Sequence, residues 1–106
     1  MGFGEIGVVT GKMLKNGFGC RVIGLKRRPE QTSDDDRSGA DEVVGLEQLY
    51  RVLAQADFVV GVLPKTEETF NFFTLEGCFA KMKKSAIFIN IGRGQTVKED
   101  DLIAAL

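Results

Sequence analysis

Three glycines near the start of the chain have the spacing of a phosphate-binding turn. Gly2, Gly4 and Gly7 fit the pattern Gly-x-Gly-x-x-Gly and stand before a helical pattern. The first glycine permits a tight turn, the second lets the backbone approach a pyrophosphate, and the third lets the helix pack closely on a sheet. Free N–H groups near Glu5 and Ile6 suit an anion. The turn predicts dinucleotide binding, with a merely structural turn as the alternative in a chain of 13 glycines.

A basic run, Lys26-Arg27-Arg28, follows the next predicted strand. NAD-binding proteins of this kind carry an acid at that place, which accepts hydrogen bonds from the adenosine ribose. Lysine and arginine cannot accept a hydrogen bond, but they can pair with a 2′-phosphate. Each charged hydrogen bond contributes about 1.5–3 kcal/mol, so the run predicts NADP(H) in preference to NAD(H). The alternative is a solvated loop that balances the acidic run Asp34–Asp36.

An arginine between two glycines follows an apolar segment further along the chain. Gly92-Arg93-Gly94 comes shortly after the predicted strand 86–90. A guanidinium there could hold a carboxylate through two parallel hydrogen bonds and polarise a neighbouring carbonyl. Arg93 is therefore predicted to bind a substrate that carries a carboxylate. The chain has no histidine, the commonest general acid and base.

The elements that must position these residues alternate between helical and strand-like patterns. Apolar strands separated by helices are typical of a parallel sheet covered on both faces, so the predicted fold class is α/β, a doubly wound parallel sheet of the Rossmann type. Right-handed crossovers then bring every strand-to-helix turn to the carboxyl edge. The predicted helices are 5–16, 46–55, 74–82 and one from 102 onward, and the predicted strands are 21–25, 41–44, 58–63 and 86–90. Residues 26–39 are predicted to form a loop or a poor helix.

Composition excludes several classes of protein. With 106 residues, 43% hydrophobic and 27% charged, the chain forms one globular domain at most. The net charge of −1 gives no reason to expect nucleic acid or a membrane as partner, and no apolar run approaches the roughly 20 residues of a membrane span. Cys20 and Cys78 lack metal-type spacing. They are expected to be buried free thiols, which fits a cytoplasmic location.

Taken together, the motifs closely resemble those of the D-isomer-specific 2-hydroxyacid dehydrogenase family. The basic run after Gly24 is most similar to that of its NADP-preferring glyoxylate/hydroxypyruvate reductases. The resemblance implies hydride transfer between a nicotinamide and C2 of a small 2-keto or 2-hydroxy acid. It covers nearly the whole chain through Gly2–Gly7, Ala56–Val60, Leu63–Thr69, Met82–Gly94 and Val97–Leu106.

The resemblance also implies roles for single residues. Arg93 would bind the substrate carboxylate and orient its carbonyl, and the backbone of Glu5 and Ile6 would contact the pyrophosphate. Family members usually dimerise through this domain, so a homodimer is expected for the full-length form. The remaining expected cofactor contacts are Leu63 and Pro64 on the adenine side, Thr69 nearby, and Ile91 and Gly92 at the nicotinamide.

The family's acid, a histidine held by a carboxylate, would lie beyond Leu106, and its first strand and substrate domain would mostly precede Gly2. We therefore expect residues 1–106 to be a partial NAD(P)-binding domain, marginally stable and without turnover alone. Asp57, Glu67 and Glu68 are not expected to replace the missing acid. Phe70, Phe72 and Phe73 are expected to pack rather than stack on a ligand.

Two other interpretations of the chain remain open. A dinucleotide-sensing module, like the corepressors that share this fold, would bind the cofactor without turnover. Another member of the family, such as a phosphoglycerate or formate dehydrogenase, is disfavoured by the basic run at Lys26–Arg28.

Overall fold

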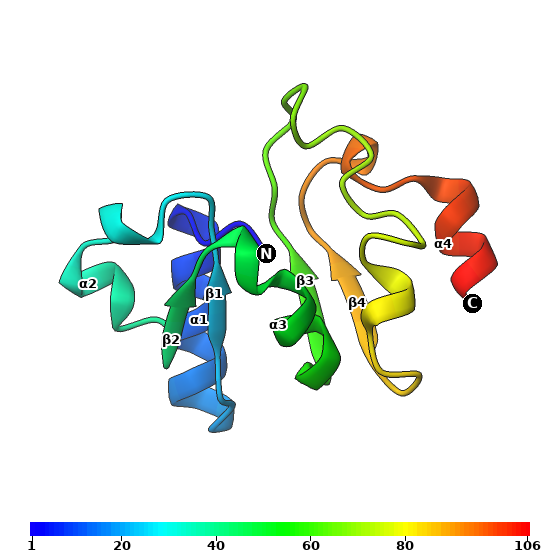
Figure 1. Ribbon diagram of the computed structural model, residues 1–106. Helices are drawn as coiled ribbons and strands as arrows, with labels where there is room; N and C mark the ends of the chain where they lie inside the picture. Colours follow the sequence, from blue (N-terminus) through cyan, green and yellow to red (C-terminus); the bar gives the residue numbers. More distant parts are fainter. The chain divides into compact units, whose positions relative to one another are not determined.

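The computed structural model describes residues 1–106 as two compact units, Met1–Leu49 (unit 1) and Tyr50–Leu106 (unit 2). Each unit contains one two-stranded sheet, and the strands of both sheets run parallel (Figure 1). Parallel pairing of short apolar strands confirms the predicted α/β class. No helix combines the length and the apolar character that crossing a membrane requires.

Unit 1 has one long helix beside its sheet (Figure 1). β1 pairs with β2 so that Leu25 lies opposite Val44. The segment between these strands contains a 3-10 turn and a short helix, both within residues 26–39, where a loop or a poor helix was predicted. The elements in chain order are α1 (Glu5–Phe18), β1 (Ile23–Leu25), η1 (Pro29–Gln31), α2 (Asp34–Arg37), β2 (Glu42–Val44) and η2 (Leu46–Gln48).

Helix α1 is longer than its pattern predicts and buries a different face. It continues beyond residue 16, its predicted end, to Phe18, and Gly19 caps it with a φ of 66°, the left-handed conformation that glycine adopts readily. Ile6, Val9, Met13 and Leu14 have the spacing of one helical face, yet the first three are about three-fifths exposed and Leu14 is only half-buried. The helix buries Gly7, Val8 and Gly11 instead.

The core of unit 1 explains why small residues are buried on α1. Phe3, Val8 and Ala40 form a buried cluster, with Val22 and Val43 packed against it. A side chain at Gly11 would collide with the backbone carbonyl of Gly39, and one at Gly24 would meet the ring of Phe3. Close backbone approach, rather than a stripe of large apolar side chains, therefore positions α1.

Unit 2 has a parallel pair in which Phe58 lies opposite Ile87 and Gly61 opposite Asn90. Its elements are α3 (Leu49–Gln55), which begins at the boundary, β3 (Phe58–Gly61), η3 (Phe79–Lys81), β4 (Ile87–Asn90), η4 (Gly94–Thr96) and α4 (Glu99–Ala105). The predicted helices at 46–55 and from 102 are confirmed, the first with a 3-10 start.

The predicted helix over 74–82 does not form. Thr74 accepts a hydrogen bond from the Gly77 N–H at 3.0 Å, as a helix cap would. The Phe79 and Ala80 N–H groups, however, donate to carbonyls five residues back, so no regular α-helical ladder develops. The segment ends in η3, with Cys78 and Phe79 buried.

Aromatic rings make up much of the core of unit 2. Phe73 is fully buried and its ring meets those of Phe72 and Phe88 at centroid distances of 5.2 and 4.9 Å. Phe79 lies edge-on to Phe88 at 5.2 Å. The packing role expected for Phe72 and Phe73 is confirmed, but Phe70 is 61% exposed and the expectation for it is wrong.

The sequence predicts a sheet covered on both faces, but part of the unit 2 sheet is exposed. Ile87 and Ile89 of β4 are 52% and 41% exposed, and Phe58 of β3 is 58% exposed. Successive side chains of a strand point to opposite faces, so Phe88 packs inward while its two neighbours do not.

Both cysteines are free thiols, as expected, although Cys20 is only half-buried. Burial raises the pKa of the Cys78 thiol to about 11. Because the thiolate is the reactive form, this burial disfavours reactions of Cys78.

Candidate functional site

The glycine turn of unit 1 is attached to the carboxyl end of β1. The Gly2 and Phe3 N–H groups both donate to the carbonyl oxygen of Leu25, at 2.9 and 3.2 Å. Gly2 has a φ of 86°, a conformation that disfavours any side chain. The tight turn expected at Gly2 is therefore present and held at the end of the strand.

The first turn of α1 presents unbonded backbone donors. Val8 donates to the Gly4 carbonyl at 2.8 Å, whereas the N–H groups of Glu5, Ile6 and Gly7 donate to no other residue of the chain. A Cβ built on Gly4 would meet nothing within 4 Å, so the space around this position is open. Unbonded N–H groups at the positive end of a helix are suited to an anion.

Gly7 is needed for a reason different from the one predicted. A Cβ on Gly7 would lie 2.5 Å from the carbonyl oxygen of Gly2, which is closer than real Cβ contacts come. The approach that excludes a side chain is thus between α1 and its own turn, not between α1 and the sheet.

The basic run lies beside this turn. Lys26 directly follows β1 and its N–H donates to the Val44 carbonyl at 3.0 Å. The side chains of Lys26 and Arg28 pair with no carboxylate of the chain. In the acidic run, Asp35 pairs instead with Lys12 of α1, at 3.4 Å. The structure therefore brings the glycine turn and the basic run to one strand end, and the acidic run does not neutralise Lys26 or Arg28.

In unit 2 the turns after β3 and β4 meet at the carboxyl ends of these strands. The Ile91 and Gly92 N–H groups donate to the carbonyl of Gly61, at 2.9 and 3.2 Å. A Cβ on Gly92 would lie 2.7 Å from the carbonyl oxygen of Leu63, so only glycine allows this approach. The predicted residues Leu63, Ile91 and Gly92 are thus brought together.

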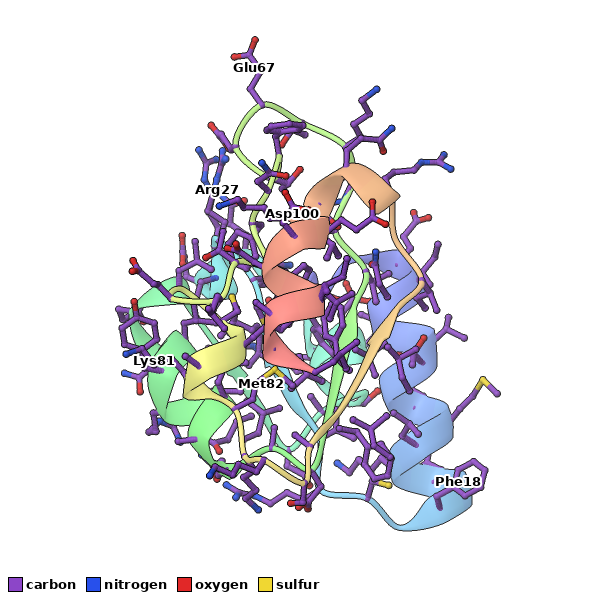
Figure 2. The ribbon with its side chains drawn as sticks, turned by 90° about the vertical axis from the view of Figure 1, so that its right-hand side faces the viewer. Phe18, Arg27, Glu67, Lys81, Met82 and Asp100 are labelled. Carbon is purple, nitrogen blue, oxygen red and sulfur yellow. The ribbon has the colours of Figure 1, made fainter.

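The hydroxyl of Thr69 is used within its own loop. It accepts the Thr66 N–H at 2.9 Å and donates to the Pro64 carbonyl at 2.5 Å. These bonds close the loop that follows β3, with Glu67 pointing outward at its tip (Figure 2). Thr69 therefore lies near Pro64, as predicted, and shapes the loop.

Arg93 has a held backbone and an unpaired side chain. Its carbonyl oxygen accepts three hydrogen bonds, from the Thr96 hydroxyl at 2.7 Å, the Thr96 N–H at 3.1 Å and the Asn90 amide at 3.3 Å. Thr96 is almost fully buried, and the Asn90 Oδ1 also accepts the Gly92 N–H at 3.1 Å. The exposed guanidinium makes no hydrogen bond or ion pair within the chain. Arg93 is therefore an unpaired cation whose backbone is fixed by three hydrogen bonds.

Asn90 and Thr96 are the residues that the sequence analysis missed. Each lies three residues from Arg93, on opposite sides of it. Short polar side chains commonly bond to backbone groups at such separations, and this spacing was the available signal.

The carboxylates set aside from catalysis lie at two different places in unit 2. Asp57 precedes β3, at the opposite end of the strand from the Leu63 turn, and pairs with Lys83 at 3.0 Å. It is exposed and takes part in this surface ion pair, in keeping with a structural position. Glu67 lies exposed in the loop after β3.

Comparison with known sequences identifies close relatives. The sequence model described as "D-isomer specific 2-hydroxyacid dehydrogenase, NAD binding domain" matches residues 1–106. Glyoxylate/hydroxypyruvate reductase B of Yersinia pestis bv. Antiqua (strain Nepal516) is 42% identical over 106 residues. That alignment covers 100% of this chain and 31% of the relative, so the chain spans about a third of the length of the curated relative it matches.

Solved structures agree with this relationship. A D-isomer specific 2-hydroxyacid dehydrogenase from Xanthobacter autotrophicus Py2, in complex with NADPH and MES, is 36% identical with a TM-score of 0.84; the match covers 99% of this chain and 40% of that one. An NADPH-dependent glyoxylate/hydroxypyruvate reductase from Sinorhizobium meliloti, in complex with NADP and sulfate, is 32% identical with a TM-score of 0.83. This match covers 100% of this chain and 33% of that one.

Proposed function

The chain belongs to the D-isomer-specific 2-hydroxyacid dehydrogenase family, and on this premise we propose that the protein transfers a hydride between NADP(H) and a small 2-keto or 2-hydroxy acid such as glyoxylate or hydroxypyruvate. One observation carries the proposal. The unpaired cations Lys26 and Arg28 lie at the same strand end as the open N-terminus of α1. A ligand with a pyrophosphate and a 2′-phosphate matches both features.

In unit 1 the glycine turn would hold the cofactor's pyrophosphate. Gly2 makes the turn, Gly4 leaves room for the approach, and the Glu5 and Ile6 N–H groups donate to phosphate oxygens. The basic run at Lys26–Arg28 would pair with the 2′-phosphate. Open space at Gly4 and unbonded donors in the first helical turn fit such a group.

In unit 2 Arg93 would bind the substrate carboxylate and orient its carbonyl. The cofactor's nicotinamide, when bound, supplies or accepts the hydride. A guanidinium without an internal partner fits the carboxylate role, because it need not give up another ion pair when the substrate binds. The remaining contacts proposed for the cofactor are Leu63, Pro64 and Thr69 beyond β3, and Ile91 and Gly92 beyond β4.

The relatives favour this function over a dinucleotide-sensing module. Those described above are named as reductases or dehydrogenases, and the Xanthobacter and Sinorhizobium structures contain NADPH or NADP. A glyoxylate/hydroxypyruvate reductase at 42% identity supports a small 2-keto acid as substrate class.

Kinetics on the protein expressed from its complete gene test the proposal. We expect oxidation of NADPH when glyoxylate or hydroxypyruvate is added, with kcat/KM about 10- to 1000-fold higher for NADPH than for NADH, since one or two charged hydrogen bonds separate the cofactors. A preference for NADH would overturn the cofactor assignment. Tight NADPH binding without turnover of any 2-keto acid would favour the sensing module.

We also propose that the protein works in the cytoplasm as a homodimer, without nucleic acid or membrane partners. Two free thiols fit a reducing compartment, and a net charge of −1 offers no general attraction for polyanions. The homodimer rests on the family resemblance. Light scattering on the purified protein would measure its mass, and a monomer at micromolar concentration would contradict the assembly.

A further inference from the structure

The segment Lys26–Thr32, here called the basic loop, is held by an arginine outside it. The Arg37 Nη2 atom of α2 donates to the carbonyl oxygen of Pro29 at 2.7 Å. The same carbonyl accepts the Thr32 N–H at 3.1 Å, and the preceding carbonyl, of Arg28, accepts the Gln31 N–H at 3.1 Å. The peptide groups of Arg28 and Pro29 therefore both accept hydrogen bonds, and the Arg37 side chain contributes one of them from outside the loop.

Arg37 is itself attached to α1 through its short helix. Ser33 caps α2 by accepting the Asp36 N–H at 3.1 Å, and Asp35 pairs with Lys12 of α1 at 3.4 Å. The turn after α2 lies against α1, because the Gly39 carbonyl occupies the space where a side chain at Gly11 would stand. This route connects the basic loop to the helix whose N-terminus is the proposed pyrophosphate site.

Arg37 directly follows three aspartates, Asp34–Asp36, yet forms no ion pair with any of them. The hydrogen-bond partner of its guanidinium is the backbone carbonyl of Pro29. The side chain therefore acts on the backbone of the basic loop, and this bond limits how the segment that carries Lys26 and Arg28 can move.

We propose that Arg37 is a positioning residue that holds the basic loop in the shape required by the 2′-phosphate, and thereby sets the preference for NADP(H). The inference rests on the proposed function. It adds a residue outside the basic run as a determinant of cofactor choice, acting through the Pro29 carbonyl.

The test compares 2′,5′-ADP with 5′-AMP, which differ by the 2′-phosphate, in calorimetric titrations of the protein expressed from its complete gene. We expect Arg37→Met to weaken 2′,5′-ADP about 5- to 20-fold and to leave 5′-AMP within about twofold, because one charged hydrogen bond to the loop is lost. Arg37→Lys, which keeps a donor and the charge, should restore most of the affinity. Lys15→Met is the matched control, since Lys15 pairs with Asp41 at 3.5 Å, away from the basic loop.

The outcomes separate this inference from the function on which it rests. If the unaltered protein binds both ligands equally, the proposed NADP(H) preference and the role of Arg37 are both wrong. If it prefers 2′,5′-ADP and Arg37→Met keeps that preference, or weakens both ligands equally, Arg37 does not set selectivity. Without ligand, Arg37→Met should also shift the amide NMR signals of Gln31 and Thr32. Unchanged signals would contradict positioning through the loop.

Discussion

At the carboxyl end of β1, the groups left without a hydrogen-bond partner are backbone N–H groups that follow the glycine turn. Beyond β4, the group left without a partner is the guanidinium of Arg93. Glycine makes the first arrangement possible, because Gly2 and Gly7 let the turn close on itself. Hydrogen bonds from Asn90 and Thr96 support the second. Substitutions that add a side chain should therefore disrupt the glycine turn. Substitutions that remove a hydrogen-bonding group should disrupt the region around Arg93.

Arg93→Met should give the largest effect. It removes the guanidinium and keeps the length of the side chain, so two charged hydrogen bonds to the substrate carboxylate are lost. At about 1.5–3 kcal/mol each, kcat/KM should fall about 10²- to 10⁴-fold, with NADPH affinity unchanged. Lys84→Met removes an exposed, unpaired cation of the same unit and is the control. Equal kinetics for both variants would show that Arg93 does not bind the substrate.

Gly7→Ala and Gly4→Ala should separate stability from binding in unit 1. At Gly7 the new methyl group would collide with the Gly2 carbonyl, and such overpacking costs about 1–3 kcal/mol of unfolding free energy. At Gly4 the free protein has space for it, so stability should be retained while NADPH affinity falls. Urea unfolding and NADPH titration of both variants measure the two effects. Unweakened NADPH binding by Gly4→Ala would argue against a pyrophosphate at this turn.

Thr96→Val tests the support beneath Arg93. It deletes the 2.7 Å hydrogen bond to the Arg93 carbonyl at nearly constant volume, which should cost about 1 kcal/mol of unfolding free energy. Turnover should decline with a raised KM for the 2-keto acid, while NADPH affinity is retained. Thr96→Ser keeps the hydroxyl and should preserve the KM. A KM that changes in Thr96→Ser as much as in Thr96→Val would assign the effect to packing.

The smallest effect concerns another hydrogen bond between a side chain and the backbone of unit 2. The Asp101 carboxylate accepts the Leu75 N–H at 2.9 Å, which, with Lys98 at 3.2 Å, lowers the pKa of Asp101 below its usual value. A lowered folded-state pKa contributes stability that is present above the unfolded pKa of about 3.9 and is lost as the pH falls through the folded pKa.

Asp101→Asn should therefore destabilise the protein at neutral pH and flatten its loss of stability below about pH 4. Asp100→Asn, on the same helix but without a bonded carboxylate, is the control. Urea midpoints across this pH range measure the difference. Parallel curves for Asp101→Asn and the unaltered protein would rule out a contribution from the Leu75 bond.

Local patterns predicted most elements of this molecule but not which faces they bury. The alternation of strands and helices predicted parallel pairing, and glycine spacing predicted the turn before α1. The pattern could not show that Ile6 and Met13 remain exposed while Val8 packs in a cluster with Phe3 and Ala40. It also could not show that Cys78 and Phe79 are buried without a helix. These outcomes depend on partners distant in sequence, which periodicity does not encode.

The sequence by itself determined the chemistry available to this protein: glycines that leave N–H groups accessible, a basic run where an acid is usual, and an arginine between glycines. Residue types and short spacings suffice for that, because charge, donor count and φ preference are local properties. Only the tertiary structure decided how these groups are supported. The Leu25 carbonyl at the end of β1 holds the glycine turn, Gly92 lies against the Leu63 carbonyl, and Arg37 holds Pro29, each through a contact set by the folded path of the backbone.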